Sequence, residues 1–408
     1  MTKKPSYRFV RYTEAWEQRK LGEVAQYRNG KAHENCIDEN GKYIVVNSKF
    51  ISTDGEVKKF SNKKNEALFE NEIAFVLSDV PNGRAIARTF WVEKNDKYTL
   101  NQRIAGITPI GETFPYFLYI LMNRHPYFLA FDDGAKQTNL SVSDVMGFEA
   151  YYPKYSEQQK IGAYFRNLDH LITLQQRKLE VLKEQKKTYL KLLFPAKGQT
   201  KPALRFAGFE DDWKEVKLGE TETLFTDGNY GEAYPSEKDL TTSENGVPFL
   251  RGSNLVNGVL DETNANYITH EKHEELTSGH IELDDIILAV RGSLGAIGYA
   301  KDENVGWNIN SQLAIIRTNK NEAKGDFLLQ FFISTKGQRE LLSRNTGTAL
   351  KQLPLKQLKD IPVPLPSLPE QEAIGSFFQG LDKSIAKQEE KVNQLKESKQ
   401  TLLRKMFI

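Results

Sequence analysis

The chain has a single cysteine, Cys36, among its 408 residues. One thiol is too few for an internal disulfide or for a zinc site built from cysteines. No apolar run approaches the roughly 18 residues that a membrane-spanning helix needs. The basic start, residues 1–5, lacks the apolar stretch of a secretion signal. We therefore expect a protein of the cytoplasm that does not enter a membrane.

An excess of one charge is also missing, because the formal net charge is only +2. The total therefore does not indicate a nucleic-acid partner, although a local basic patch still can, since electrostatic steering depends on how charge is distributed. The length predicts about two or three domains.

Motifs for catalysis are absent. The glycines of residues 292–298 do not have the Gly-x-Gly-x-x-Gly spacing of a dinucleotide site, and no Gly-x-x-x-x-Gly-Lys-Ser/Thr sequence for ATP occurs. No Asn/Asp-Pro-Pro-Tyr/Phe sequence of an amino-methyltransferase is present. The histidines of residues 270–280 lack the spacing of a zinc protease. We expect no catalytic residue, no cofactor and no metal in this chain.

An internal repeat is the informative feature. The segment Glu-Gln-Gln-Lys-Ile-Gly at residues 157–162 recurs as Glu-Gln-Glu-Ala-Ile-Gly at residues 370–375. The match continues without a gap, and both copies end in a phenylalanine, Phe194 and Phe407.

A second repeated motif lies upstream in each half. Arg8-Phe9 and the segment 16–23 match Arg205-Phe206 and the segment 213–220. The predicted order is globule, helix, globule, helix, and the second globule is the longer one. The expected parts are residues 1–156, 157–196, 197–369 and 370–408.

Both repeated helices carry apolar residues in steps of three and four, which is typical of a seam buried against another helix. A surface helix packed on its own domain would show a similar stripe. The two stripes match in phase and are interrupted at equivalent positions, which favours mutual pairing. The seam residues are Ile161, Phe165, Leu168, Ile172, Leu179 and Leu182 in the first helix, and Ile374, Phe378, Leu381, Ile385, Val392 and Leu395 in the second.

Connectivity predicts the direction of the helices. The first helix delivers the chain to the second globule, so the second helix must run back antiparallel if each globule keeps its ends together. The result would be a pseudo-two-fold repeat. About 35 helical residues span roughly 50 Å. Duplex DNA of the same length has about 15 base pairs. Pro153 and Pro369 precede the two helices, and Pro195 with Gly198 ends the first.

Each globule is predicted to be of the α/β (α+β) class. Short apolar runs of the buried-strand type alternate with turns, and an aromatic-rich helix follows. The expected strands are 42–46, 72–77 and the run from 104 in the first globule, and 247–250, 285–290 and the run from 313 in the second. The expected helices are 115–122 and 326–333.

A loop precedes each long helix, at residues 134–140 and 347–353. Ser141 and Asp144 form a predicted helix cap, and Pro354 takes the corresponding first-turn position. Backbone N–H groups at these helix starts, beside Lys136 or Lys351, would suit a phosphate. A plain structural connection explains the same sequence equally well.

Loop tips in both globules carry side chains of the kinds that contact DNA. Arginine suits guanine, asparagine and glutamine suit adenine, and lysine contacts phosphate. A solvated loop residue remains the alternative for each position. The candidates are Asn47, Lys49, Arg84, Asn101, Gln102, Arg103 and Lys136 in the first half, and Arg251, Asn254, Arg291, Asn310, Gln312 and Lys351 in the second.

The repeated motifs, in this order, resemble the specificity subunit of type I restriction–modification systems over essentially the whole chain. The resemblance implies two target recognition domains, each for one half of a bipartite DNA site, and helices that set the spacer. It also implies two modification subunits and restriction subunits as partners, which would use S-adenosylmethionine, ATP and Mg. No catalytic residue is carried over by this resemblance.

A non-enzymatic coiled-coil scaffold whose globules bind proteins is the other hypothesis. Helix pairing suits it equally well. The basic and amide-rich loops and the unequal globules favour DNA recognition, because a symmetric scaffold has no reason to diversify its tips. Salt-dependent binding to duplex DNA separates the two hypotheses.

Overall fold

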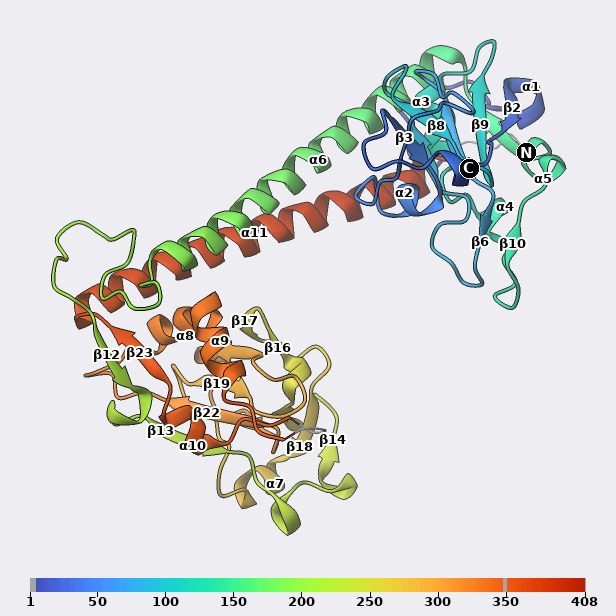
Figure 1. Ribbon diagram of the computed structural model, residues 1–408. Coiled ribbons are helices and arrows are strands. Elements are labelled where there is room, and N and C mark those ends of the chain that lie inside the picture. Colours follow the sequence, from blue (N-terminus) through green and yellow to red (C-terminus); the bar gives the residue numbers. More distant parts are fainter. Residues whose placement is uncertain (1–4, 348–350, 408) are drawn as a thin grey trace. The chain divides into compact units, whose positions relative to one another are not determined.

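The structure is a computed structural model that describes residues 5–347 and 351–407 (Figure 1). The chain forms two compact units. Unit 1 comprises Met1–Gln176 and Glu390–Ile408, and unit 2 comprises Arg177–Glu389. Each long helix therefore contributes one part to each unit, whereas the sequence predicted the helices as separate parts of the chain.

Unit 1 is built around a four-stranded antiparallel sheet in the order β2-β9-β5-β7 and a three-stranded sheet in the order β4-β3-β8. Two short antiparallel pairs, β1-β11 and β6-β10, complete it. The strands are β1 (Glu17–Lys20), β2 (Ala25–Asn29), β3 (Tyr43–Val46), β4 (Phe60–Ser61), β5 (Ile73–Val76), β6 (Ser78–Asp79), β7 (Thr89–Trp91), β8 (Tyr98–Leu100), β9 (Ile104–Pro109), β10 (Thr138–Asn139) and β11 (Glu149–Tyr152). The helices are α1 (Leu21–Val24), η1 (Glu34–Cys36), α2 (Ser48–Ser52), α3 (Pro115–Met122), α4 (Pro126–Leu129) and α5 (Val142–Met146).

Unit 2 repeats this plan and extends it. Its main sheet has the order β13-β22-β19-β20-β17-β16, its second sheet the order β14-β18-β15-β21, and β12 pairs with β23. The strands are β12 (Lys214–Lys217), β13 (Leu224–Asp227), β14 (Leu240–Thr241), β15 (Gly246–Leu250), β16 (Leu255–Val256), β17 (Gly258–Leu260), β18 (Asn266–Thr269), β19 (Ile286–Ala289), β20 (Ile297–Tyr299), β21 (Asn308–Ile309), β22 (Leu313–Arg317) and β23 (Pro362–Leu365). The helices are η2 (Leu218–Glu220), η3 (Gly231–Ala233), η4 (Glu237–Asp239), η5 (Gly252–Asn254), α7 (His270–Glu275), η6 (Asp302–Asn304), α8 (Gly325–Ile333), α9 (Thr335–Ser343) and α10 (Leu355–Lys359).

The predicted α/β (α+β) class and the predicted strands and helices are confirmed. The order β2-β9-β5-β7 of unit 1 corresponds to β13-β22-β19-β20 of unit 2. The greater length of the second globule includes β16 and β17, which extend the main sheet, and α7, which follows β18.

The central strands β5 and β19 are apolar at every position because both of their faces are buried. In β5, Ile73 and Phe75 belong to the core on the helix side of the sheet, and Ala74 and Val76 belong to the core shared with the second sheet. Successive side chains of a strand point to opposite faces, so a strand covered on both faces must be apolar at every position. Strand β19 of unit 2 divides its residues between two cores in the same way.

The long helices are α6 (Tyr155–Leu192) and α11 (Leu368–Met406). Pro153 lies before α6, as predicted. Pro369 lies inside the first turn of α11 and does not precede it, because the first turn tolerates a residue without an N–H group. None of the helices in the described ranges is long and apolar enough to cross a membrane.

Within each unit the two helices run antiparallel, as predicted. In unit 1 the first part of α6 lies beside the last part of α11, and Lys399 forms an ion pair with Asp169 at 2.5 Å. In unit 2 the last part of α6 lies beside the first part of α11, and Lys186 forms the matching ion pair with Asp382 at 2.6 Å.

The predicted seam is buried most deeply near the helix ends. Ile161 and Phe165 share the core of unit 1 with Met406 from the end of α11. Ile374 and Phe378 share the core of unit 2 with Leu190 from the end of α6. Packing on the globule and mutual pairing therefore both hold at these positions. Leu179 and Val392 are also buried, whereas Leu168, Ile172, Leu182, Leu381, Ile385 and Leu395 are half-buried.

The start of each long helix, which we call the helix root, is fixed by the repeated Glu-Gln pair. Arg8 donates two hydrogen bonds of 2.6 Å to the carboxylate of Glu157, and Arg205 donates two of 2.7 Å to Glu370. Both carboxylates are only 1% exposed. The repeated arginines and glutamates are therefore partners in two buried, bidentate ion pairs.

The glutamines of the repeat join each root to the aromatic-rich helix of its unit. The Oε1 atom of Gln158 accepts the backbone N–H of Phe114 just before α3, at 2.9 Å. The Oε1 atom of Gln371 accepts the N–H of Lys324 just before α8, also at 2.9 Å. N–H groups at a helix start have no partner within the helix, so these glutamines replace a cap.

Candidate nucleic-acid interface

Four loops of unit 2 meet beyond the ends of its strands. We call residues 227–230, 290–295, 310–312 and 346–353 the second loop cluster; Thr348–Leu350, which belong to a predicted loop, lie outside the described residues. The N–H of Val290 donates to the carbonyl of Gln312 at 2.9 Å, and the N–H of Leu353 donates to the carbonyl of Val290 at 2.9 Å. Backbone hydrogen bonds therefore fix how these loops lie against one another.

The corresponding loops of unit 1 form the same bonds. We call residues 29–31, 77–84, 101–103 and 134–140 the first loop cluster. The N–H of Leu77 donates to the carbonyl of Arg103 at 3.0 Å, and the N–H of Leu140 donates to the carbonyl of Leu77 at 2.8 Å. The matched loops of the sequence repeat are therefore matched in backbone structure as well.

Side chains at matched positions of the two clusters differ. Ser78 in β6 pairs with Asn139 in β10, and the equivalent isolated bridge of unit 2 joins Arg291 to Gln352. A serine and an asparagine in one unit thus stand where an arginine and a glutamine stand in the other. The same backbone arrangement therefore carries side chains with different hydrogen-bonding groups in the two units.

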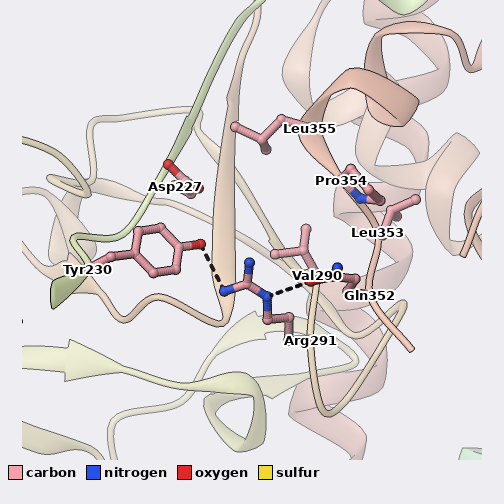
Figure 2. A pocket seen from close by; sticks show the side chains of 8 residues that line it. All are labelled: Asp227, Tyr230, Val290, Arg291, Gln352, Leu353, Pro354 and Leu355. Carbon is pink, nitrogen blue, oxygen red and sulfur yellow. Dashed lines mark hydrogen bonds between the residues drawn. The ribbon is translucent and has the colours of Figure 1, made fainter. Parts of the chain in front are cut away.

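Arg291 is a charged group of the second loop cluster that bonds both Tyr230 and Gln352 (Figure 2). Its guanidinium lies 5.1 Å from the centre of the Tyr230 ring and lines a cavity of about 150 Å³. Its Nη1 donates to the hydroxyl of Tyr230 at 3.1 Å and to the carbonyl of Ser311 at 3.2 Å, and its Nε donates to Oε1 of Gln352 at 3.2 Å. Several contacts therefore hold this long side chain in one orientation.

Tyr230 supports the arginine as an uncharged hydroxyl. Burial, with Asp227 beside it, raises the pKa of Tyr230 above its ordinary value. Its hydroxyl also donates to the carbonyl of Ser311 at 3.0 Å. Because the proton stays on the oxygen near neutral pH, the hydroxyl donates to Ser311 and accepts from Arg291 at the same time.

Most predicted DNA-contact residues have exposed side chains. Gln102 bonds Glu34 at 2.6 Å, and Arg251 bonds the carbonyl of Asn264 at 3.0 Å. The exposed candidates are Lys49, Arg84, Gln102, Arg103, Lys136, Arg251, Gln312 and Lys351, while Arg291 is half-buried.

Two of the candidate asparagines are buried and hydrogen-bond the protein backbone. Asn254 is 2% exposed and bonds the N–H of Arg251 and the carbonyl of Asp261. Asn310 is 7% exposed, and its Oδ1 accepts the N–H of Gln312. Burial is incompatible with base contact in this conformation, so these two predictions are corrected.

Two half-buried candidates are also engaged within unit 1. Asn47 caps α2, because its side chain accepts the N–H of Phe50 at 2.8 Å. The Oδ1 atom of Asn101 lies 3.3 Å from Nδ1 of the buried His33. Asparagine suits turns and caps as well as base edges, and its chemistry alone does not separate these roles.

Two backbone donors of the predicted phosphate site at α5 are already used within the helix start. Ser141 and Asp144 form the expected capping box, in which Asp144 accepts the N–H of Ser141 at 2.8 Å and its hydroxyl at 2.6 Å. The carboxylate of Asp144 therefore takes the N–H of Ser141, and the phosphate site stays a prediction. In the second copy Pro354 is the cap residue of α10 and not its first helical residue.

Sequence reasoning missed Ser78, Asn139, Tyr230 and Gln352. Their signal was their place directly beside the matched strand ends, which becomes clear only when the strand pairings are known. No group of three or more histidine, cysteine, aspartate or glutamate side chains suited to a metal lies among residues 5–347 and 351–407.

Comparisons with known proteins agree with this architecture. The type I restriction–modification DNA specificity domain matches residues 13–184 and again residues 210–397. The chain is 22% identical to the type I restriction enzyme MjaVIII specificity subunit of Methanocaldococcus jannaschii, over 97% of this chain and 92% of the relative. It is 26% identical to the EcoBI specificity subunit of Escherichia coli, over 46% of this chain and 40% of the relative.

A solved structure has the same fold. The crystal structure of the type I restriction–modification S subunit from M. genitalium superposes with a TM-score of 0.65 at 19% identity, covering 100% of this chain and 99% of that one. Because the specificity-domain family matches both halves and most of the sequence, the chain belongs to the type I restriction–modification DNA specificity family.

Proposed function

We propose that this chain selects the DNA sequence on which a type I restriction–modification complex acts. In this proposal the first loop cluster recognises one half of a bipartite target and the second recognises the other half. The observation that supports it most strongly is the pair of loop clusters with the same backbone hydrogen bonds and different side chains. A protein that recognises two different half-sites needs one scaffold twice, with different donors and acceptors on it.

The long helices would set the spacer between the half-sites and dock two modification subunits. Helices of 38 and 39 residues are roughly 57 Å long at about 1.5 Å per residue. Modification subunits would supply methyl transfer to adenine from S-adenosylmethionine, and restriction subunits would supply the chemistry that uses ATP and Mg. In this division of labour the chain contributes recognition and assembly and its partners contribute catalysis.

Salt dependence tests the DNA role against the scaffold hypothesis. Each phosphate that a lysine or arginine neutralises lowers the slope of log K against log salt by roughly 0.9. Replacing Arg103 and Lys136 by alanine should therefore make the slope of the assembled complex shallower by roughly two. The matched control replaces Lys238 and Lys301, exposed lysines outside both clusters, and should leave the slope unchanged.

A scaffold would bind duplex DNA weakly and without this dependence. Mapping methylated sites in DNA from cells that carry the complete system would then identify the two half-sites. A complex with no sequence-specific binding and no methylation pattern that depends on this chain would refute the proposal.

A further inference from the structure

The donors of Arg291 are unequally occupied. Its Nε and Nη1 atoms are bonded to Gln352, Tyr230 and Ser311. Its Nη2 atom makes no hydrogen bond within residues 5–347 and 351–407. The internal bonds fix the plane of the guanidinium, and Nη2 keeps two N–H groups for a ligand.

Gln352 keeps its amide donor in full and only part of its acceptor. A free glutamine pairs with adenine because its oxygen accepts from the base while its nitrogen donates. Here one of the two lone pairs of the Gln352 Oε1 atom already accepts from Arg291, whereas the Nε2 group makes no hydrogen bond within residues 5–347 and 351–407 and keeps both N–H groups for a ligand. The backbone bridge between the same two residues keeps their side chains adjacent.

Two open donors on adjacent side chains, Nη2 of Arg291 and Nε2 of Gln352, fit one base best. In the major groove guanine presents two acceptors, N7 and O6, whereas adenine presents an acceptor and a donor and cytosine presents a donor. We propose that Arg291 and Gln352 act together to recognise a guanine in the half-site of unit 2. The inference rests on the proposed function and specifies one contact within it.

Rigidity strengthens the assignment. The Tyr230 ring supports the guanidinium at 5.1 Å, and the Tyr230 hydroxyl is itself fixed by its bond to Ser311. A side chain that is already ordered loses less conformational entropy on binding than a free arginine does. Arg103, an exposed residue with no side-chain hydrogen bond in the described part of unit 1, lacks this advantage.

The first loop cluster does not repeat the arrangement. Gln137 donates to the Ser78 hydroxyl at 2.7 Å and to Oδ1 of Asn139 at 3.3 Å. No guanidinium stands at this position, so the guanine contact belongs to one half-site alone. Ser78→Ala is therefore the matched variant for Arg291→Ala.

Methylation mapping with the complete complex gives the first test. Arg291→Ala and Arg291→Lys should relax the requirement at one guanine of one half-site by roughly 5- to 150-fold. Lysine keeps the charge without the planar fork, so loss of specificity in both variants separates base recognition from simple charge. Ser78→Ala and the surface control Lys238→Ala should leave that position as stringent as in the natural chain.

Modified DNA gives a second test that cannot perturb folding. In duplexes that carry the mapped target, 7-deazaguanine is placed at each guanine of the half-sites in turn, which removes the N7 acceptor. One substitution should weaken binding by the natural complex about tenfold, and the Arg291→Ala complex should lose little more at that position.

The outcomes are distinguishable. If the natural complex binds its target but Arg291→Ala keeps the same preference at every base, the guanine assignment is wrong and the DNA role stands. If no 7-deazaguanine substitution couples to Arg291, the assignment is likewise wrong. If the natural complex shows no sequence preference at all, the proposed function fails and this inference fails with it.

Discussion

The helix roots and the loop clusters behave in opposite ways when the two units are compared. At the roots, Arg8 with Glu157 and Arg205 with Glu370 make the same bonds to within about 0.1 Å. In the loop clusters the backbone bonds also match, but arginine and glutamine in unit 2 replace serine and asparagine in unit 1. Identity is kept in the buried ion pairs, and difference is found in the loops, where Asn139 and Gln352 are exposed, Arg291 is half-buried and Ser78 is buried.

Buried charge explains why the roots are the same in both units. A charge removed from a buried pair leaves its partner without water and without a counter-ion, which is costly. An exposed loop residue exchanges protein contacts for water at little cost. The two units therefore hold their helices in the same way and still carry different recognition surfaces.

The largest effect is expected at the buried ion pairs. Glu157→Ala and Glu370→Ala should each lower the free energy of unfolding by about 3–5 kcal/mol, because each leaves a largely buried arginine unpaired. Urea unfolding of the full chain, followed by tryptophan fluorescence, measures this. Trp16 and Trp213 are buried in the two cores and report on each unit.

An exposed ion pair of unit 1 provides the control. Lys154 and Glu14 are paired at 2.5 Å, but their side chains are 70% and 57% exposed. Glu14→Ala should change the stability by less than about 1 kcal/mol. If only one of the two substitutions Glu157→Ala and Glu370→Ala lowers the free energy of unfolding by about 3–5 kcal/mol, the two roots are not energetically equivalent.

A smaller effect is expected at the repeated glycines Gly162 and Gly375. A Cβ atom on Gly162 would lie 2.5 Å from the ring of Phe114, and one on Gly375 would lie 2.3 Å from the carboxylate of Asp326. Substitution by alanine must displace these side chains and should cost about 1–2 kcal/mol of stability. Thermal unfolding of each variant measures the loss.

Gly380 of α11 supplies a control of opposite sign. Nothing lies within 4 Å of a Cβ atom built there. Gly380→Ala should therefore stabilise the chain by up to about 1 kcal/mol, because alanine has the higher helix propensity. A loss at Gly380 as large as that at Gly375 would show that close packing does not explain the cost of alanine, because no side chain has to move at Gly380.

The helix roots were predictable in outline because they recur in the sequence. The repeat located the long helices, and connectivity gave their antiparallel direction. The partners of the repeated residues were not predictable, since Arg8 and Glu157 are far apart in sequence and only the fold brings them together. The predicted seam likewise identified the apolar face of each long helix. The phase of the seam does not tell whether a neighbouring helix or the core of a globule covers each residue.

The sequence predicted where the loop clusters lie in the chain. It did not predict which of their side chains are free to contact DNA. The matched strand ends identified the right loops. Within them, Asn254 and Asn310 resembled base-contact residues and are buried structural groups. Tyr230 and Gln352 were overlooked, because their importance comes from bonds between separate loops, and nothing in the sequence fixes which loop residues become neighbours.

The smallest effect is expected where polar residues interrupt the helix seams. Lys399 pairs with Asp169 in unit 1, and Lys186 pairs with Asp382 in unit 2. In a double-mutant cycle each pair should show a coupling of about 0.5–1 kcal/mol, since the side chains remain 15–40% exposed. Exchanging the charges within one pair, as in Lys399→Asp with Asp169→Lys, should restore most of the stability lost in either single variant. Because the two pairs are matched, equal couplings would mean that both units select the antiparallel register by the same device. A coupling confined to one unit would assign that selection to one end of the helix pair.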